Sequence, residues 1–147
     1  MRGAITPMAT EDQMTVLDAH IAHHKHVQAL YEELLKDVKG VHIHKQPADP
    51  RYGANLTIVF LCHDSAEASS ELVPLLSLLN RFMLGKKVEC RPVWKPMHKQ
   101  PVYAENDVYT NGVEEELFKV GFCLPAGPYV TDEDVHYIVD CIREAIS

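Results

Sequence analysis

Apolar side chains recur every three or four residues through the first quarter of the chain. This spacing places them on one face and predicts a helix from Glu11 to Lys39. Gly40 follows as a natural C-terminal stop, and residues 1–10 are expected to form an irregular lead-in. The apolar face consists of Met14, Leu17, Ile21, Val27, Leu30, Tyr31, Leu34, Leu35 and Val38.

Four shorter apolar runs are typical of strands. The run Leu56–Cys62 is continuous and rich in β-branched residues, which indicates a buried strand. Val41–His44, Val88–Arg91 and the "GFCLP" segment at 121–125 are shorter candidates. A polar segment with two prolines, residues 45–53, separates the first two strands and is predicted to turn.

Three more helices are predicted after the second strand. Leu72–Leu84 is apolar, and its Pro74 is tolerable only in a first helical turn. Val113–Lys119 forms a short acidic helix. The last helix begins after Thr131, an N-cap residue, with Asp134 placed as the acid of a capping box. Its apolar stripe is Val135, Ile138, Val139, Ile142 and Ile146.

This order of elements predicts an α/β fold in which helices cover a small sheet of mixed or antiparallel sense. The 147 residues are of a size typical of one domain. We therefore expect residues 1–147 to form a single domain.

A proline-rich ribbon, "RPVWKPMHKQPVY", interrupts this pattern at Arg91–Tyr103. Pro92, Pro96 and Pro101 rule out a regular helix and a central strand, so a stiff irregular course is predicted. The ribbon also holds Trp94, the one tryptophan of the chain.

Two interpretations of the ribbon remain open from physical chemistry alone. Trp94 offers a flat face for stacking, Arg91 and Lys95 offer positive charge, and His98 offers a titratable donor. Such a set would suit a small anionic ligand. Alternatively, the ribbon is a structural loop whose tryptophan fills the edge of the core.

Composition narrows the function classes. With 46% hydrophobic residues the chain can bury a core, and a net charge of −7 favours solubility and argues against nucleic-acid binding. The densest basic run is too short for a duplex; it comprises Lys86, Lys87, Arg91, Lys95 and Lys99. No apolar run reaches about 18 residues and no leader pattern opens the chain, so neither a membrane span nor a signal peptide is expected.

The four cysteines show no CxxC pair and no zinc-knuckle spacing. Three of them have apolar neighbours, which indicates buried free thiols in a reducing compartment and therefore a cytoplasmic protein. The four are Cys62, Cys90, Cys123 and Cys141.

Other candidate chemistry is weaker. His20 and His24 lie four apart on the first helix and could ligate zinc or nickel, but no third ligand is fixed beside them, and packing or a subunit interface is the alternative. No metal site is therefore predicted. The three glutamates of "VEEELF", residues 113–118, are interpreted as a solvated helix face.

The segments "ECRPVWKPMHKQPVY" and "LFKVGFCLPAGPYVTDEDVHYIVDCIREAI" resemble the C-terminal part of the DegT/StrS-type aminotransferases. These segments match the family pattern nearly throughout, with mild changes at Val93, Tyr103, Phe122 and Ala126. The first helix, "LDAHIAHHKHVQALYEELL", resembles the family's helix that joins its two domains. Residues 54–80 match only loosely.

These relatives are pyridoxal-phosphate (PLP) enzymes that aminate nucleotide-linked keto-sugars. The resemblance implies the fold of the C-terminal small domain of a fold-type I PLP aminotransferase. It also implies that PLP and its Schiff-base lysine belong to a large N-terminal domain that has no counterpart here. We therefore expect a truncated form or isolated small domain that holds no cofactor by itself and does not transaminate.

The resemblance assigns substrate binding to the ribbon and no catalytic residue to this chain. His98 would touch the sugar or nucleotide phosphates, Arg91, Trp94 and Lys95 would support or line the cleft, and Met97 would pack beneath it. Expected partners are a second copy bound through the first helix and a PLP-binding large domain supplied in trans. The alternatives are a dimerising interaction module or a binder of a small anionic ligand, both without catalysis.

Overall fold

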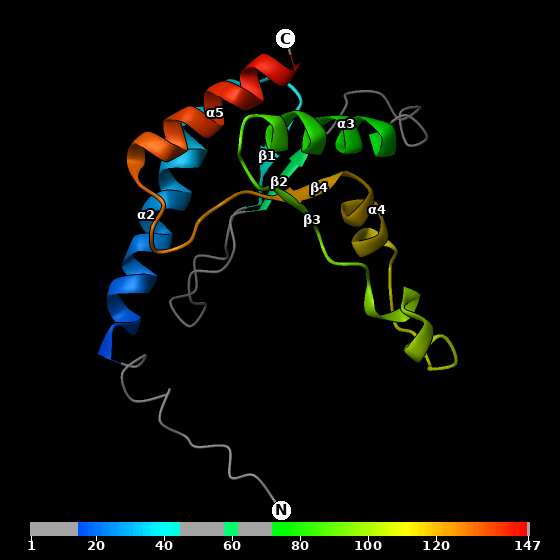
Figure 1. Cartoon of the computed structure of the whole chain (residues 1–147). Helices are drawn as coiled ribbons and strands as arrows, with labels where there is room; N and C mark the ends of the chain where they lie inside the picture. Colours follow the sequence, from blue (N-terminus) through cyan, green and yellow to red (C-terminus); the bar gives the residue numbers. More distant parts are fainter. Residues whose placement is uncertain (1–14, 45–57, 62–71, 147) are drawn as a thin grey trace, which may run out of the picture.

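The computed structural model describes residues 15–44, 58–61 and 72–146 (Figure 1). The expectations for residues 1–10, for the 45–53 turn and for Cys62 lie outside this part. The helices are α2 (Leu17–Leu35), α3 (Leu72–Gly85), α4 (Val113–Val120) and α5 (Asp132–Ile146). The strands are β1 (Val41–Ile43), β2 (Ile58–Leu61), β3 (Arg91–Pro92) and β4 (Gly121–Cys123).

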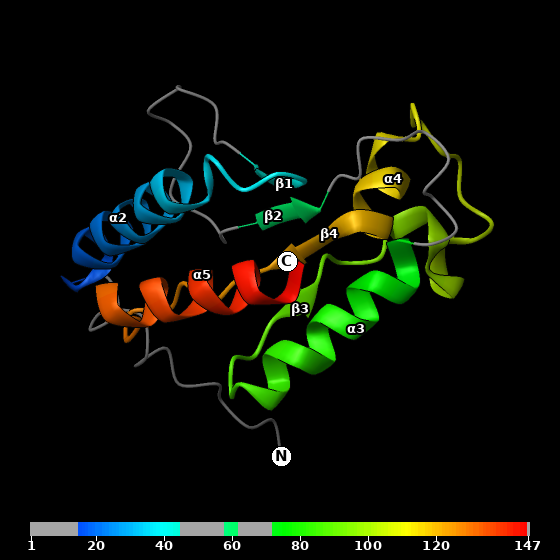
Figure 2. The same ribbon diagram turned by 90° about the horizontal axis from the view of Figure 1, so that it is seen from above.

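The strands form one antiparallel sheet in the order β1-β2-β4-β3. Val59 of β2 lies opposite Ile43 on one side and Phe122 on the other, so the sheet joins distant parts of the sequence. The predicted α/β fold with a small antiparallel sheet is confirmed. α5 lies between α2 and α3 and contacts both, and these helices cover the sheet (Figures 1 and 2).

The core forms between the helices and the sheet. Val135, Ile138, Val139 and Ile142 of α5 are buried, as the apolar stripe predicts, whereas Ile146 at the end of the helix is exposed. The other buried hydrophobic residues around them are Val27, Tyr31, Leu35, Val41, Leu79, Met83, Val88, Cys90, Phe122, Leu124, Ala126 and Cys141.

The first helix is buried over its second half alone. Val27, Tyr31 and Leu35 are fully buried, but residues 15–20 are exposed, including Leu17 of the predicted apolar face. The helix ends at Leu35 rather than at Lys39, and a turn that carries Gly40 at a φ of 79° follows it. The apolar face of α2 therefore extends beyond the part of the helix that packs in the core.

The third strand differs from its prediction. Val88 and Cys90 are buried, as expected of strand residues, but the paired residues are Arg91 and Pro92. The reason is the turn that ends α3: Lys87 has a φ of 62°, and the Val88 backbone N–H donates to the Met83 carbonyl. The chain thus enters the sheet later, at an edge where a proline is tolerated.

The start of α5 has the predicted capping box. The Asp134 backbone N–H donates to Thr131 Oγ1 over 3.2 Å, and Asp134 Oδ2 accepts from the Thr131 N–H over 2.9 Å. The cysteine prediction is confirmed for the three described residues, because Cys90, Cys123 and Cys141 are free and buried. Of the helices described, none combines the length and the apolar character that crossing a bilayer requires.

Candidate functional site

The proline ribbon continues into an arm, residues 94–109, that leaves the sheet after β3 and returns to α4 (Figure 1). Two short 3-10 turns, η2 (Met97–Lys99) and η3 (Pro101–Tyr103), interrupt its irregular course. At its base, the Val93 N–H donates to the Gly121 carbonyl over 3.1 Å. At its β3 end the arm therefore continues directly from the sheet.

Most of the arm is exposed, including its apolar residues. Trp94 is 68% exposed and lies outside the core, so it does not fill the core edge. Met97 is exposed as well, and its sulfur accepts a hydrogen bond from Gln100 Nε2 over 3.4 Å within the ribbon. The exposed large apolar residues of the arm are Trp94, Met97, Val102, Tyr103, Val108 and Tyr109.

His98 turns from the arm onto α4. Its Nε2 lies 2.9 Å from Glu115 Oε1, and its Nδ1 lies 3.8 Å from Glu114 Oε1. Lys99 reaches the second oxygen of Glu115 over 3.1 Å. With its side chain 17% exposed, His98 is the most enclosed of the candidate residues, and it lies between two carboxylates.

The contacts around Glu114 and Glu115 lower the pKa of both carboxyl groups. Hydrogen bonds from His98 and Lys99 lower the pKa of Glu115 below its usual value. A hydrogen bond from the Thr110 hydroxyl, followed by the effects of its own backbone and of His98, lowers the pKa of Glu114. Both groups are therefore held as anions that face the cationic side of the arm.

The three glutamates of α4 are predicted to form a solvated helix face. Glu114 and Glu115 stay partly exposed, as this prediction requires, but both also contact side chains of the arm. Glu116 fits it better, since it is exposed and pairs with Lys119 within the same helix. Glu115 lies seventeen positions after His98 in the sequence, and the rest of the arm connects them. No periodic pattern in the sequence could indicate that contact.

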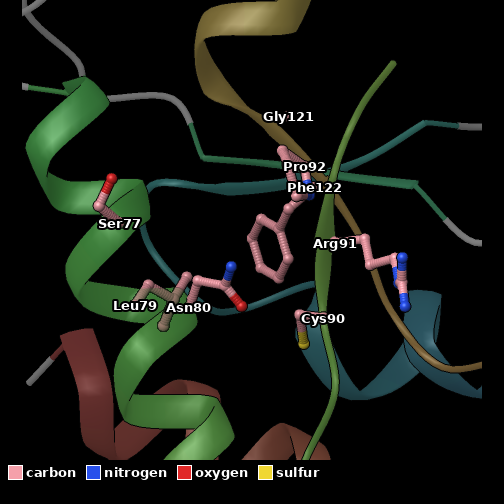
Figure 3. A pocket seen from close by; sticks show the side chains of 8 residues that line it. All are labelled: Ser77, Leu79, Asn80, Cys90, Arg91, Pro92, Gly121 and Phe122. Atoms are coloured by element: carbon pink, nitrogen blue, oxygen red, sulfur yellow. The ribbon is translucent and has the colours of Figure 1, made fainter.

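Arg91 lies at the base of the arm, and its guanidinium pairs with the neighbouring Glu89 on the surface. It also borders a small cavity of about 90 Å³ between α3 and the β3–β4 edge. Figure 3 shows Phe122 and Cys90 beside that space, whereas the Arg91 side chain points away from it. Burial, with smaller contributions from Cys123 and Cys141, raises the pKa of the Cys90 thiol to about 12, so it stays protonated.

The four candidate residues therefore lie along one segment but not in one cluster. Arg91 faces Glu89 and His98 faces α4, while Trp94 and Lys95 are exposed between them. Of the four candidate residues, the structure thus leaves the Trp94 ring and the Lys95 ammonium group facing outward. These two groups are accessible to a ligand or to another protein surface.

The histidines of α2 contact the segment that leads into α5. His23 Nε2 lies 3.0 Å from the Gly127 carbonyl oxygen, and His26 Nε2 lies 2.8 Å from Asp132 Oδ1. His24 Nδ1 is buried without a hydrogen-bond partner, and burial, with the charges of His23 and His20, lowers the pKa of His24. Over the described ranges, no three potential metal ligands come together, so His20 and His24 gain no third ligand there.

Comparisons with known proteins agree on one family. The model of the DegT/DnrJ/EryC1/StrS aminotransferase family matches residues 7–143. The chain is 28% identical over 137 residues to a Bacillus subtilis (strain 168) protein described as the pyridoxal phosphate-dependent aminotransferase EpsN, covering 88% of this chain and 32% of that protein. It is 27% identical to the GDP-perosamine synthase of Escherichia coli O157:H7, covering 92% of this chain and 34% of the enzyme.

Solved structures show the same fold. The aminotransferase TlmJ from Streptoalloteichus hindustanus superposes with a TM-score of 0.73 at 17% identity, covering 91% of this chain and 34% of TlmJ. A structure of DesI with its TDP-sugar product gives 0.68 at 22% identity, covering 89% and 32%. The chain thus spans about a third of the length of the relatives it matches. The chain belongs to the DegT/DnrJ/EryC1/StrS aminotransferase family.

Proposed function

We propose that these residues supply the small-domain part of a PLP-dependent aminotransferase that acts on nucleotide-linked keto-sugars. The Schiff-base lysine and the cofactor would come from the two thirds of the relatives' length that this chain does not match. The observation that carries the proposal is the alignment of nearly the whole chain with one third of sugar-aminotransferase relatives. Catalysis by this chain alone is not part of the proposal.

The lysines in the described part of the chain do not suit PLP. A Schiff-base lysine must be able to lose its proton and must lie over the cofactor ring, which requires an enclosed position. In residues 15–44 and 77–146, by contrast, every lysine is exposed or half-buried at the surface. Lys86 is the most constrained of them, but its hydrogen bond to Glu144 raises its pKa and keeps it charged.

The groove between the α3–β3 turn and α5 does not suit PLP either. It measures about 560 Å³ and is lined in part by Lys86, Lys87, Asp134 and Tyr137, which superficially resembles a PLP site. However, the carboxylate of Asp134 is occupied by Thr131, and the ammonium group of Lys86 is bound to Glu144. The groups that a pyridinium nitrogen and an aldehyde would need are already used, so the groove does not fit the cofactor.

The arm is the part of the chain that we assign to the nucleotide sugar. Trp94 and Lys95 are exposed and adjacent, and this pairing of an aromatic face with a cation suits a base or sugar that carries a diphosphate. Arg91 at the base of the arm, and His98 where the arm contacts α4, would support them. The assignment differs from the one that the resemblance implies, in which His98 touches the phosphates, because His98 is paired with Glu115 of α4.

The exposed apolar residues of the arm also favour a second function, a dimerising module without catalysis. Such a module would bury Trp94, Met97 and Tyr109 against another copy rather than against a cofactor domain. It would be indifferent to PLP and to nucleotide sugars. One exchange experiment distinguishes the two functions.

In that experiment, residues 15–146 replace the matching third of the GDP-perosamine synthase of Escherichia coli O157:H7. If the proposal is right, the chimera binds PLP, shown by visible absorbance that survives dialysis, and turns over that enzyme's own substrate. This chain alone, incubated with PLP, should keep no such absorbance. Stable PLP binding by the isolated chain, or a folded chimera that cannot bind PLP, would contradict the proposal.

A matched pair of variants tests the assignment of the arm. Lys95→Met in the chimera should raise KM for the nucleotide sugar, because a cation facing the diphosphate is lost. Lys119→Met removes a lysine that pairs with Glu116 on α4, away from the arm, and should leave KM unchanged. Equal effects of the two substitutions would remove the arm from the substrate site.

A further inference from the structure

Glu115 is the one carboxylate of the described residues that two side chains of the arm reach together. Its Oε1 lies 2.9 Å from His98 Nε2, and its Oε2 lies 3.1 Å from Lys99 Nζ. Both oxygens are therefore used, by two successive residues of η2. We call Glu115, His98 and Lys99 the Glu115 cluster.

Apart from the contacts with Glu115, little burial or long-range hydrogen bonding holds the described arm in place. In residues 94–109, Pro96, His98 and Gln100 are half-buried and the remaining side chains are exposed. Its described backbone hydrogen bonds are local, such as Lys99 N–H to the Pro96 carbonyl and Tyr103 N–H to the Gln100 carbonyl. Local bonds shape the two 3-10 turns but do not fix where the arm points.

The helix that carries Glu115 is, in contrast, tied to the body. α4 leads directly into β4, and the Gly121 N–H at its C-cap donates to the Leu117 carbonyl. Residues 117–120 are half-buried, and α4 contacts α3, β2 and β4. Figures 1 and 2 show α4 beside the end of the sheet, between the body and the arm.

We propose that Glu115 is a positioning residue that fixes the direction of the arm by holding His98 and Lys99 against α4. The exposed ring of Trp94 and the ammonium group of Lys95 then face outward in one orientation. Charge, rather than apolar packing, sets the geometry of the arm. Glu114 strengthens the arrangement from 3.8 Å, and the Thr110 hydroxyl holds Glu114 where the chain returns.

The arrangement has a defined dependence on pH. The groups that act on Glu115 are His98 and Lys99 of η2 and the neighbouring Glu114, and no charged residue of α3 or β4 is among its described ionic partners. Because the folded pKa of Glu115 is lowered, its contribution is complete above the ordinary glutamate value. The contribution is lost as the pH falls through the lowered folded value.

The inference deepens the proposed function, because the arm carries the residues assigned to the nucleotide sugar. Its test uses this chain alone. Failure of the test would leave the chimera result standing, and failure of the chimera would leave the positioning role of Glu115 standing.

Amide hydrogen exchange of residues 97–104 measures how firmly the arm is held. Glu115→Gln keeps the size of the side chain but removes its charge, and it should lower protection there about five-fold. Glu116→Gln is the matched control, because Glu116 pairs with Lys119 within α4 and should change nothing. Residues 132–146 of α5 serve as the internal reference.

Lys99→Met provides the second variant. It should also lower protection in the arm, but it should add little in the Glu115→Gln background, because both changes remove the same contact. Fluorescence anisotropy of Trp94 should fall as wild-type protein is acidified through the Glu115 titration and should be flat in Glu115→Gln. If Glu115→Gln also loses protection in α5, that variant no longer reports on the arm alone. The test then rests on arm protection in Lys99→Met and in wild-type protein at 1 M salt.

Unchanged arm protection in Glu115→Gln, with α5 intact, would overturn the proposal. So would additive effects of Glu115→Gln and Lys99→Met, or an arm that is insensitive to salt and to Lys99→Met.

Discussion

Tyr31 is the most fully buried polar side chain that joins two distant segments. It has no exposed surface, and its hydroxyl donates to the Pro125 carbonyl over 2.9 Å. Burial is also the main reason that the pKa of Tyr31 is raised above its ordinary value. The sequence placed Tyr31 on the apolar face of a helix, but it could not show which carbonyl would accept the hydroxyl proton.

Tyr31→Phe should therefore destabilise the fold by about 1 kcal/mol, because a buried hydrogen bond is lost and its acceptor is left unpaired. Tyr137→Phe is a matched control, since it also removes a hydroxyl that donates to a backbone carbonyl, that of Lys86, but from a side chain that is half exposed. Its loss should be smaller. Urea unfolding of both variants measures the difference, and equal losses would show that burial does not set the cost.

His24 gives a second prediction at this scale. Because burial lowers its pKa, the unfolded chain binds its proton more readily than the folded protein does. Its contribution thus makes the fold less stable as the pH falls below the ordinary histidine value. His24→Leu should reduce the loss of stability between about pH 7.5 and about pH 5.5. His136→Leu, which removes an exposed histidine of α5, is the comparison variant.

At the scale of elements, the capping box of α5 explains where that helix begins. Thr131→Ala removes the acceptor for the Asp134 N–H and should cost about 1 kcal/mol in urea unfolding. Thr131→Ala together with Asp134→Ala should cost less than the sum of the two, because both act on the same hydrogen bonds. Additive losses would mean that Asp134 stabilises the helix through its charge rather than through Thr131.

The helices followed from the sequence because the signals that define them are local. Apolar spacing and the cap at Thr131 lie within a few residues of the elements they predict. β3 was misplaced because Val88 and Cys90 are buried without strand pairing, which depends on the left-handed turn at Lys87. The partnership of Glu115 with His98 was missed for a similar reason, since it depends on the path of the arm rather than on any spacing.

At the scale of the whole molecule, exposed apolar residues of the described part lie on two segments that project from the body. The first turns of α2 expose Val16 and Leu17, and the arm exposes Trp94, Met97 and Tyr109. In Figure 1 both point downward from the body, the start of α2 at the left and the arm at the right. Exposed apolar patches of this kind tend to be covered by another protein surface, which agrees with a chain that matches one third of its relatives.

In the absence of another protein, a second copy is the available cover, and we expect the isolated chain to associate as its concentration rises. Leu17→Glu should weaken this association, because it places a charge in the exposed apolar face of α2. Leu84→Glu is the control: Leu84 is 64% exposed, but it lies at the end of α3, away from both surfaces. Sedimentation velocity over a range of concentrations measures the effect. A chain that stays monomeric throughout, or that responds equally to both substitutions, would show that the first helix is not the contact.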